Sequence, residues 1–176
     1  MCVIVDTNCF ASVFDSTSAR HSEFSPILDW IINGKGKLIY GGSKYIQELE
    51  KSKKYLKIFS LLNSKAKKVV VVDRQKVDEE QSRIENLVID PDFDDPHLPA
   101  IVIVAKCEII CTEDTRSVRF ITDGRLYPKG VSIPKYYTSR RNTDLLCDKY
   151  INKRYKPLTK CAKKDADLLN LRLNKE

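Results

Sequence analysis

Short, unbroken runs of apolar residues recur along the chain, and each one stops at a polar residue or a turn. The clearest lie at 2–5, 38–40 and 69–72, and weaker ones lie at 108–112 and 130–134. A run without alternating polar positions is typical of a strand buried on both faces, the kind of strand found in parallel sheets. These runs therefore indicate an α/β fold with about five mostly parallel strands.

Helical signals fill the segments between the runs. Ser25 and Pro26 offer an N-cap and a first-turn proline for a helix that stops at Gly34. A charged surface helix is predicted over 73–87. A long amphipathic helix is predicted from Ser43 onward, with the inward-facing positions Ile46, Leu49, Leu56, Phe59 and Leu62. Strands that alternate with helices predict a three-layer α/β/α domain.

Residues 96–105 are ambiguous, because the β-branched run 101–104 also fits a strand. Asp94 or Asp95 can cap a helix whose first residue is Pro96. Since residues 108–112 already supply the next strand, we predict a buried helix here.

Acidic residues stand close to the ends of the predicted strands. Asp6 and Asp114 follow strands, while Glu48 and Asp95 lie near helix starts. In a parallel sheet these positions share one edge, where ligands bind, so the four carboxylates are predicted to converge. A hard divalent cation would relieve their repulsion. Magnesium suits such a set because it prefers oxygen ligands, and in phosphodiester cleavage one or two such ions activate water and stabilise the leaving oxygen.

Four motifs, taken in this order, resemble the PIN-domain nucleases between residue 2 and about residue 137. They are Ile4-Val5-Asp6-Thr7-Asn8, Tyr45-Ile46-Gln47-Glu48-Leu49, Asp95-Pro96-His97-Leu98-Pro99-Ala100 and Cys111-Thr112-Glu113-Asp114. The resemblance implies a three-layer PIN-like domain at 1–138 that acts as a metal-dependent endoribonuclease, often a bacterial toxin of the VapC type. It also implies products with 5′-phosphate and 3′-hydroxyl ends.

The same resemblance implies roles for particular residues. Asn8 and Thr112 fall where the family has polar residues that orient the metal ligands. The family further implies an RNA substrate, an antitoxin or effector-complex partner in its toxin branch, and frequent homodimers. The catalytic ligands of one or two Mg²⁺ or Mn²⁺ ions would be Asp6, Glu48, Asp95 and Asp114.

The chain departs from the family pattern at Ser117, where many relatives have a further acid. This difference favours an alternative function, that of a non-catalytic nucleic-acid-binding or scaffold module with the same fold. Asp94 and Asp95 can both act simply as helix caps, and His97 is more simply a packing or hydrogen-bonding residue than a general base. Rival acids stand beside the candidates, namely Glu50, Asp94 and Glu113.

Positive charge is concentrated in the last third of the chain. Residues 1–122 carry 17 basic and 18 acidic side chains, whereas residues 123–176 carry 14 and 6. This asymmetry points to a polyanionic partner, and we predict a basic helical extension at 139–176. Interleaved tyrosines such as Tyr136 and Tyr137 favour a platform for single-stranded nucleic acid, the alternative being a solvated helix with inward tyrosines. The candidate nucleic-acid contacts are Arg116, Arg119, Arg125, Lys129, Lys135, Arg140 and Arg141.

The cysteines and histidines do not have the spacing of zinc ligands. Without an export signal or an apolar run long enough to span a membrane, we expect a cytoplasmic protein with free thiols and no membrane partner. Residues 161–173 have apolar positions at near-helical spacing and can dock on a partner or a second copy.

Overall fold

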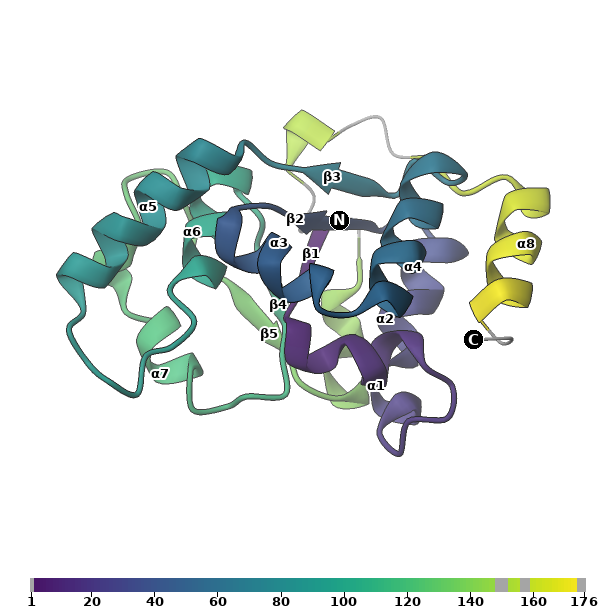
Figure 1. Ribbon diagram of the computed structural model, residues 1–176, viewed down its shortest axis with the longest axis horizontal. Helices are drawn as coiled ribbons and strands as arrows, with labels where there is room; N and C mark the ends of the chain where they lie inside the picture. The colour runs from purple at the N-terminus through teal and green to yellow at the C-terminus, as the bar shows by residue number, and fades with distance from the viewer. Residues whose placement is uncertain (1, 148–151, 156–158, 174–176) are drawn as a thin grey trace.

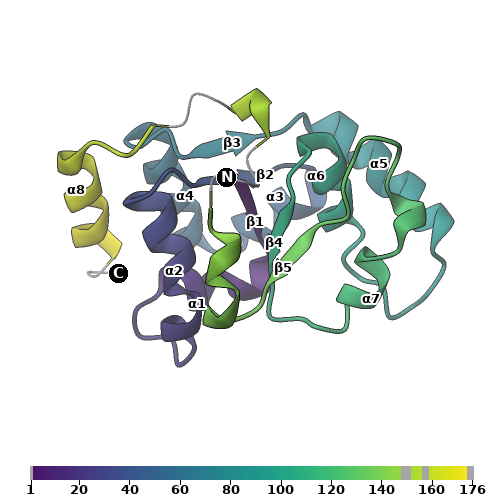
Figure 2. The same ribbon diagram turned by 180° about the vertical axis from the view of Figure 1, so that it is seen from behind.

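The computed structural model describes residues 2–147, 152–155 and 159–173. Its centre is a five-stranded sheet in the order β3-β2-β1-β4-β5, in which every neighbouring pair is parallel. Helices α2 and α4 lie to one side of the sheet, and α5 and α6 lie to the other (Figures 1 and 2). The α/β class, with a central parallel sheet between layers of helices, is therefore confirmed.

The strands are β1 (Cys2–Val5), β2 (Lys37–Tyr40), β3 (Val69–Val71), β4 (Ile109–Cys111) and β5 (Lys135–Tyr137). The α-helices are α1 (Phe10–Phe14), α2 (His21–Ile32), α3 (Ser43–Glu50), α4 (Lys53–Ser64), α5 (Arg74–Leu87), α6 (His97–Ala105), α7 (Val118–Ile121) and α8 (Lys163–Leu173). Short 3₁₀ helices are η1 (Thr7–Cys9), η2 (Gly124–Leu126), η3 (Arg140–Leu145) and η5 (Lys153–Tyr155).

The central strand β1 determines where the polar edge lies. Val3, Ile4 and Val5 are completely buried, because helices cover both faces of the sheet. In the register Val5 stands opposite Cys111 of β4, and the Asp6 N–H donates to the Cys111 carbonyl at 2.9 Å. The residues that follow β1 and β4 therefore leave the sheet side by side at its carboxyl edge.

The prediction of a last strand at 130–134 is wrong, since β5 begins at Lys135. Two features prevent pairing along the predicted run. Gly130 has a positive φ of 87°, and Pro134 has no N–H to donate. The ladder therefore starts where the Lys135 N–H donates to the Glu108 carbonyl at 2.7 Å.

The boundaries of two predicted helices also differ from those observed. The long helix from Ser43 is two helices, α3 and α4, and Leu56 is 42% exposed instead of facing inward. Helix α2 begins at His21, so Pro26 lies inside it. Because proline has no N–H, α2 lacks the hydrogen bond that residue 26 would otherwise donate to the Ser22 carbonyl.

The buried helix predicted after Pro96 is confirmed as α6, and it ends at Lys106, whose φ is 51°. Its last carbonyls are bonded from the C-terminal part of the chain. The Arg154 guanidinium donates to the Val104 carbonyl at 3.1 Å, and the Tyr155 hydroxyl donates to the Ala105 carbonyl at 2.6 Å. This part of the extension therefore packs against the α/β domain.

Helix α8 packs on α4, within the same chain (Figure 1). Its residues Ala166, Leu169 and Leu173 are buried, so these three of the apolar positions predicted for docking on a partner are covered by the chain itself, whereas Ala162 is exposed. Buried Lys68 anchors the segment that precedes α8, because its ammonium donates to the carbonyls of Gly34 and Thr159 at 2.9 Å each. The basic and aromatic residues Lys149, Tyr150 and Lys156 lie outside the described residues.

All six cysteines are free thiols, as expected. Cys2, Cys9, Cys107 and Cys111 are buried around β1 and β4 as small core side chains. Across the described ranges, no helix combines the length and the apolar character that crossing a membrane requires.

Candidate metal centre

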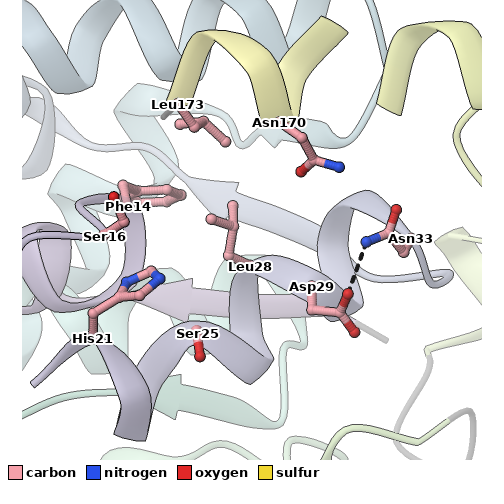
Figure 3. A pocket seen from close by; sticks show the side chains of 9 residues that line it. All are labelled: Phe14, Ser16, His21, Ser25, Leu28, Asp29, Asn33, Asn170 and Leu173. Carbon is pink, nitrogen blue, oxygen red and sulfur yellow. Dashed lines mark hydrogen bonds between the residues drawn. The ribbon is translucent and has the colours of Figure 1, made fainter. Parts of the chain in front are cut away.

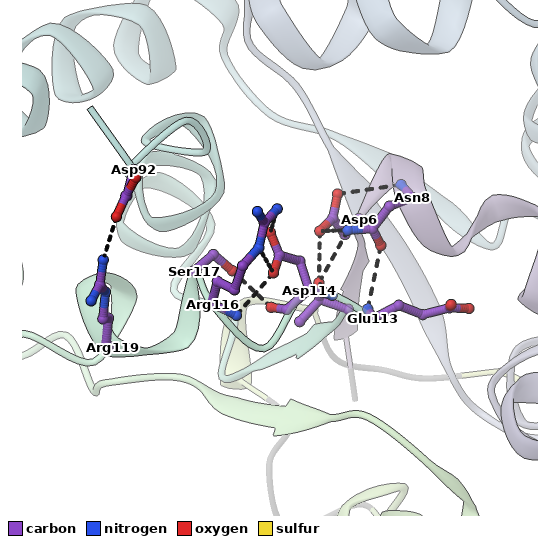
Figure 4. Close-up of polar contacts among 9 residues, drawn as sticks. Asp6, Asn8, Asp92, Glu113, Asp114, Arg116, Ser117 and Arg119 are labelled. Atoms are coloured by element: carbon purple, nitrogen blue, oxygen red, sulfur yellow. Dashed lines mark hydrogen bonds and ion pairs between the residues drawn. The ribbon is translucent and has the colours of Figure 1, made fainter. Parts of the chain in front are cut away.

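A hydrogen-bonded network joins the ends of β1 and β4 (Figure 4). The buried Asp6 carboxylate accepts from the Thr112 hydroxyl at 2.7 Å and from the Asn8 amide nitrogen at 2.8 Å. Thr112 Oγ1 in turn accepts from the Asp114 N–H at 3.0 Å. The Asn8 side-chain oxygen accepts from the Glu113 N–H at 3.3 Å. Asn8 and Thr112 thus lie where they were predicted to orient acidic neighbours.

Glu48 reaches the same edge from α3. Gly42, with a φ of 80°, precedes the helix and leaves no room for a side chain, because an added Cβ would meet Val77 at 2.5 Å. Asp78 of α5 then accepts from the Ser43 N–H at 2.7 Å, which fixes the start of α3. Glu48 lies in the second turn of this short helix and not at its amino end as predicted.

The Glu48 carboxylate has one partner in η1, which follows β1, and one on its own helix. Its Oε2 accepts from the Thr7 hydroxyl at 2.9 Å, and its Oε1 lies 3.3 Å from the Lys44 ammonium. The rival residue Glu50 is exposed at the end of α3. Of these two acids, the structure therefore brings Glu48 to the edge.

Three carboxylates form a cluster beside this network. Asp94, Asp95 and Asp114 each offer an oxygen, and these oxygens all lie within 4.8 Å of one another, so they could hold a metal ion. The sequence left Asp94 and Asp95 as alternatives, and the structure brings both together. The N-cap residue of α6 is Pro96, and within the described chain no side-chain hydrogen bond caps this helix. Helix capping therefore does not explain either aspartate.

Burial and mutual repulsion shift the proton affinities of two of these acids. Burial, reinforced by Asp6, Asp94, Glu48 and Asp114, raises the pKa of Asp95 to about 7. Burial also raises the pKa of Asp6 to about 6, against the opposing hydrogen bond from Thr112. Among the described residues, no lysine or arginine forms an ion pair with Asp6 or Asp95. A negative charge on either of these two acids is therefore not neutralised by a basic side chain of the described residues.

Other acids at the edge do have basic partners. Arg116 Nε lies 3.1 Å from an Asp114 oxygen, and the hydrogen bond from this guanidinium lowers the pKa of Asp114. Arg20 lies 2.9 Å from Glu113, and Lys44 pairs with Glu48 as described. The edge is thus a group of carboxylates with cations at its rim.

His97 lies next to Glu48 and is completely buried. Its Nε2 is 3.8 Å from Glu48 Oε2, and neither ring nitrogen has a hydrogen-bond partner among the residues that the structure describes. Burial lowers the pKa of His97 to about 4, so the imidazole is neutral at pH 7. Of the two roles predicted for it, these features agree with packing and not with hydrogen bonding.

Two of the predicted nucleic-acid contacts adjoin the cluster. Arg119 pairs with Asp92 at 2.9 Å (Figure 4). Its guanidinium also lies 4.4 Å above the Phe120 ring. Arg116 is bonded to Asp114. A cavity of about 470 Å³ opens beside them and is lined by Pro91, Asp92, Asp94, Thr115, Arg116 and Arg119.

The remaining basic candidates are spread more widely. Arg125 pairs with Asp123 at 2.6 Å, outside the acidic cluster. Lys129 and Lys135 precede or begin β5, which places them towards its amino end, away from the acids. Arg140 and Arg141 follow β5 in η3 and are exposed.

The predicted stacking platform is not supported by the tyrosines in the described part of the chain. Tyr137 is buried, and its hydroxyl donates to the Glu23 carbonyl at 2.9 Å. The Tyr127 hydroxyl donates to the Ile121 carbonyl at 2.7 Å, and the Tyr136 hydroxyl is buried. These rings pack inward, as the alternative interpretation had it, although Tyr136 and Tyr137 lie on strand β5 and not on a solvated helix.

Ser117, at the position of the missing fifth acid, has a structural role. It is 1% exposed, and its hydroxyl donates to the Asp114 carbonyl at 3.0 Å. Its own carbonyl accepts from the N–H groups of Phe120 and Ile121 at the start of α7. Ser117 therefore fixes the turn that carries Asp114.

Sequence reasoning missed three residues at this edge. Thr7 was quoted as part of a motif without a role, although its hydroxyl holds Glu48. Lys44 stands four residues before Glu48, which is a recognisable ion-pair spacing on a helix. Arg20 reaches Glu113 across 93 residues of sequence, and no local pattern indicates such a contact.

A separate hollow of about 190 Å³ lies between α2 and α8 (Figure 3). Phe14, Leu28 and Leu173 supply its apolar lining, and Asp29 accepts a hydrogen bond from Asn33 at 2.7 Å. Asp29 is the one acid among its described lining residues, so the hollow does not resemble the cluster at the sheet edge.

Comparison of the chain with models of known protein families, with curated proteins and with solved structures finds no match. The functional interpretation therefore depends on the fold and on the geometry of this edge.

The raised pKa values predict how cation binding depends on pH. Asp6 and Asp95 hold protons more tightly in the folded chain than in the unfolded chain, where the ordinary value is 3.8. Their contribution to stability is therefore complete below that value and is lost as the pH rises through about 6 and 7. A cation must displace these protons, so its affinity rises over the same range.

We accordingly expect saturating Mg²⁺ to raise the Tm by roughly 5 °C at pH 8 and hardly at all at pH 5. The measurement is a thermal melt with and without Mg²⁺ at each pH. His97 has the opposite sign, because its lowered pKa removes stability as the pH falls, but it does so with and without the cation. An equal rise in Tm at pH 5 and pH 8 would contradict the prediction.

Proposed function

We propose that the protein is a PIN-like endoribonuclease that depends on a divalent metal and hydrolyses RNA phosphodiester bonds. The observation that carries the proposal is the cluster of carboxylate oxygens from Asp94, Asp95 and Asp114, within 4.8 Å of one another at the carboxyl edge of a parallel sheet. Ligands of open α/β sheets bind at this edge. Asp6 and Glu48 border the cluster, since both raise the pKa of Asp95 through their charge.

The donor set fits Mg²⁺ or Mn²⁺. Every donor in the cluster is a carboxylate oxygen, which hard cations prefer and which differs from the sulfur and nitrogen ligands typical of structural zinc. The uncompensated charge at Asp95 and Asp6 is what a bound cation would neutralise. When bound, the cation lowers the pKa of water and stabilises negative charge on the phosphate and on the leaving oxygen.

The residues of the chain then have separate tasks. Asp94, Asp95 and Asp114 hold the cation, with Asp6 and Glu48 as further acids beside it. Thr112 and Asn8 fix the orientation of the Asp6 carboxylate, and Thr7 fixes that of Glu48. Arg116 and Arg119 attract the phosphates of the substrate on the side of the cavity. The expected products carry 5′-phosphate and 3′-hydroxyl ends.

The test is cleavage of labelled total RNA by purified protein with Mg²⁺, with Mn²⁺ and with a chelator. The control is the Asp6→Asn, Asp114→Asn double variant, and single-stranded DNA of matched sequence distinguishes the two nucleic acids. Discrete products that need the cation and are absent from the double variant are the expected result. Absence of cleavage, together with salt-sensitive RNA binding that survives in the double variant, would instead indicate a non-catalytic RNA-binding module.

A further inference from the structure

Arg116 binds a carboxylate of the cluster at two points (Figure 4). Its Nε donates to Asp114 Oδ1 and its terminal nitrogen donates to Oδ2, both at 3.1 Å, while its backbone N–H donates to Oδ1 at 2.9 Å. Both oxygens that Asp114 can offer to a cation are therefore engaged by one residue. A divalent cation and the guanidinium compete for the same atoms.

The ion pair between Arg116 and Asp114 can break at a small cost in stability. The Arg116 side chain is 82% exposed, and exposed ion pairs of this kind contribute little stability. Asp114 itself is held from its backbone side, because its N–H donates to Thr112 and its carbonyl accepts from Ser117. Loss of the guanidinium would therefore leave the carboxylate in its place.

A released guanidinium would lie beside a suitable acceptor site. The cavity of about 470 Å³ next to the cluster is lined by both Arg116 and Arg119. Thr115, which follows Asp114 in the sequence, also lines it. Guanidinium groups bind phosphate oxygens in the same two-point geometry that they use for carboxylates. A phosphate can thus replace Asp114 as the partner of Arg116.

We propose that Arg116 is an exchangeable counter-ion, which occupies Asp114 in the metal-free protein and transfers to a substrate phosphate when a divalent cation takes that carboxylate. The proposal rests on the metal-dependent function proposed above. On this proposal, cation binding and polyanion binding strengthen each other. A bound phosphate draws Arg116 away from Asp114, which the cation needs, and a bound cation draws Asp114 away from Arg116, which the phosphate needs. By linkage, the two affinities must rise by the same factor.

The chain contains a matched internal control. Arg125 forms the same two-residue pair with Asp123, with its backbone N–H and its guanidinium both on that carboxylate. The negative charges of Asp92 and Asp94, in addition to that of Asp114, raise the pKa of Arg116. The pKa of Arg125 is raised by Asp123. Replacing Arg125 therefore removes an equivalent pair that has no place in the cluster.

The experiment measures the Kd for Mn²⁺ by electron paramagnetic resonance, with and without a single-stranded thymidine oligomer. In the wild-type protein the oligomer should tighten Mn²⁺ binding about tenfold, and a neutral methylphosphonate oligomer should not. In Arg116→Gln, Mn²⁺ should bind about fivefold more tightly without the oligomer, and the effect of the oligomer should fall to about twofold. Arg125→Gln should behave as the wild type does.

Arg119→Gln separates exchange from general electrostatics, since it removes the same charge from the same cavity without touching Asp114. If Arg119→Gln tightens Mn²⁺ binding as much as Arg116→Gln does, or if Arg116→Gln leaves both values unchanged, the exchange is disproved. Cation-dependent cleavage would then still stand as the function. Failure of the wild-type protein to bind Mn²⁺ at all would overturn the proposed function as well.

Discussion

Replacing Asp95 by asparagine is expected to abolish cation-dependent cleavage and, at the same time, to stabilise the metal-free protein. Asp95 lies at the centre of the acidic group, because burial and four neighbouring carboxylates all raise its pKa. Asparagine keeps the size of the side chain but removes the charge that a cation needs. We expect cleavage to fall about a thousandfold, as removal of several kcal/mol of electrostatic stabilisation implies.

The gain in stability follows from the same charge. At pH 8 an ionised Asp95 is repelled by its neighbours, and because the side chain is only partly buried, solvent screens part of this repulsion. Removing the charge should therefore add about 2 kcal/mol of stability, less than the full pKa shift implies, and raise the Tm by roughly 5 °C. At pH 4 both proteins carry an uncharged side chain here, and the difference should vanish. Addition of Mn²⁺ should raise the Tm of the wild type and leave that of Asp95→Asn unchanged.

Asp90→Asn is the matched control for this variant. Asp90 lies in the same segment, is exposed, and accepts the Asp92 N–H within a turn, a bond that asparagine can keep. It is not one of the three acids of the cluster. Full cleavage by Asp95→Asn, or an equal loss in Asp90→Asn, would show that the cluster is not the reactive centre.

The fold could be predicted from the sequence largely because of the apolar runs. A run such as Ile4-Val5 before Asp6 permits few interpretations once helices separate it from similar runs. The position of β5 could not be obtained in this way, because Val131 and Ile133 are apolar but Pro134 cannot donate to the neighbouring strand. Hydrophobicity alone does not report which N–H groups are free to pair.

The candidate site could likewise be predicted only in part. Asp6, Thr112 and Asp114 follow strands, so sheet topology was enough to predict that they lie together. The choice between Asp94 and Asp95 depends on how a turn approaches the edge, and the structure brings both into the cluster. Pairs such as Arg20 with Glu113 connect distant segments and depend on the packing of the whole chain. Sequence thus predicts the acids better than it predicts the cations that balance them.

Replacing Thr112 by valine is expected to disconnect the two acidic segments without changing the shape of the core. The buried Thr112 hydroxyl donates to Asp6 at 2.7 Å and accepts from the Asp114 N–H at 3.0 Å. Valine has nearly the same volume and supplies neither contact. Because one lost bond involves a buried carboxylate, the free energy of unfolding should fall by about 2 kcal/mol.

The effect on activity should exceed what this loss of stability explains. Groups that orient metal ligands typically change metal affinity or activity by about 10- to 100-fold, so Thr112→Val should weaken Mn²⁺ binding and cleavage by that factor at a temperature where the variant is fully folded. Thr112→Ser retains the hydroxyl and loses a methyl group, so it should keep most of the cation affinity despite a comparable loss in packing. If the serine variant binds Mn²⁺ as weakly as the valine variant, the hydroxyl bridge is not what aligns Asp6 with Asp114, and the alignment must come from the pairing of β1 with β4 alone.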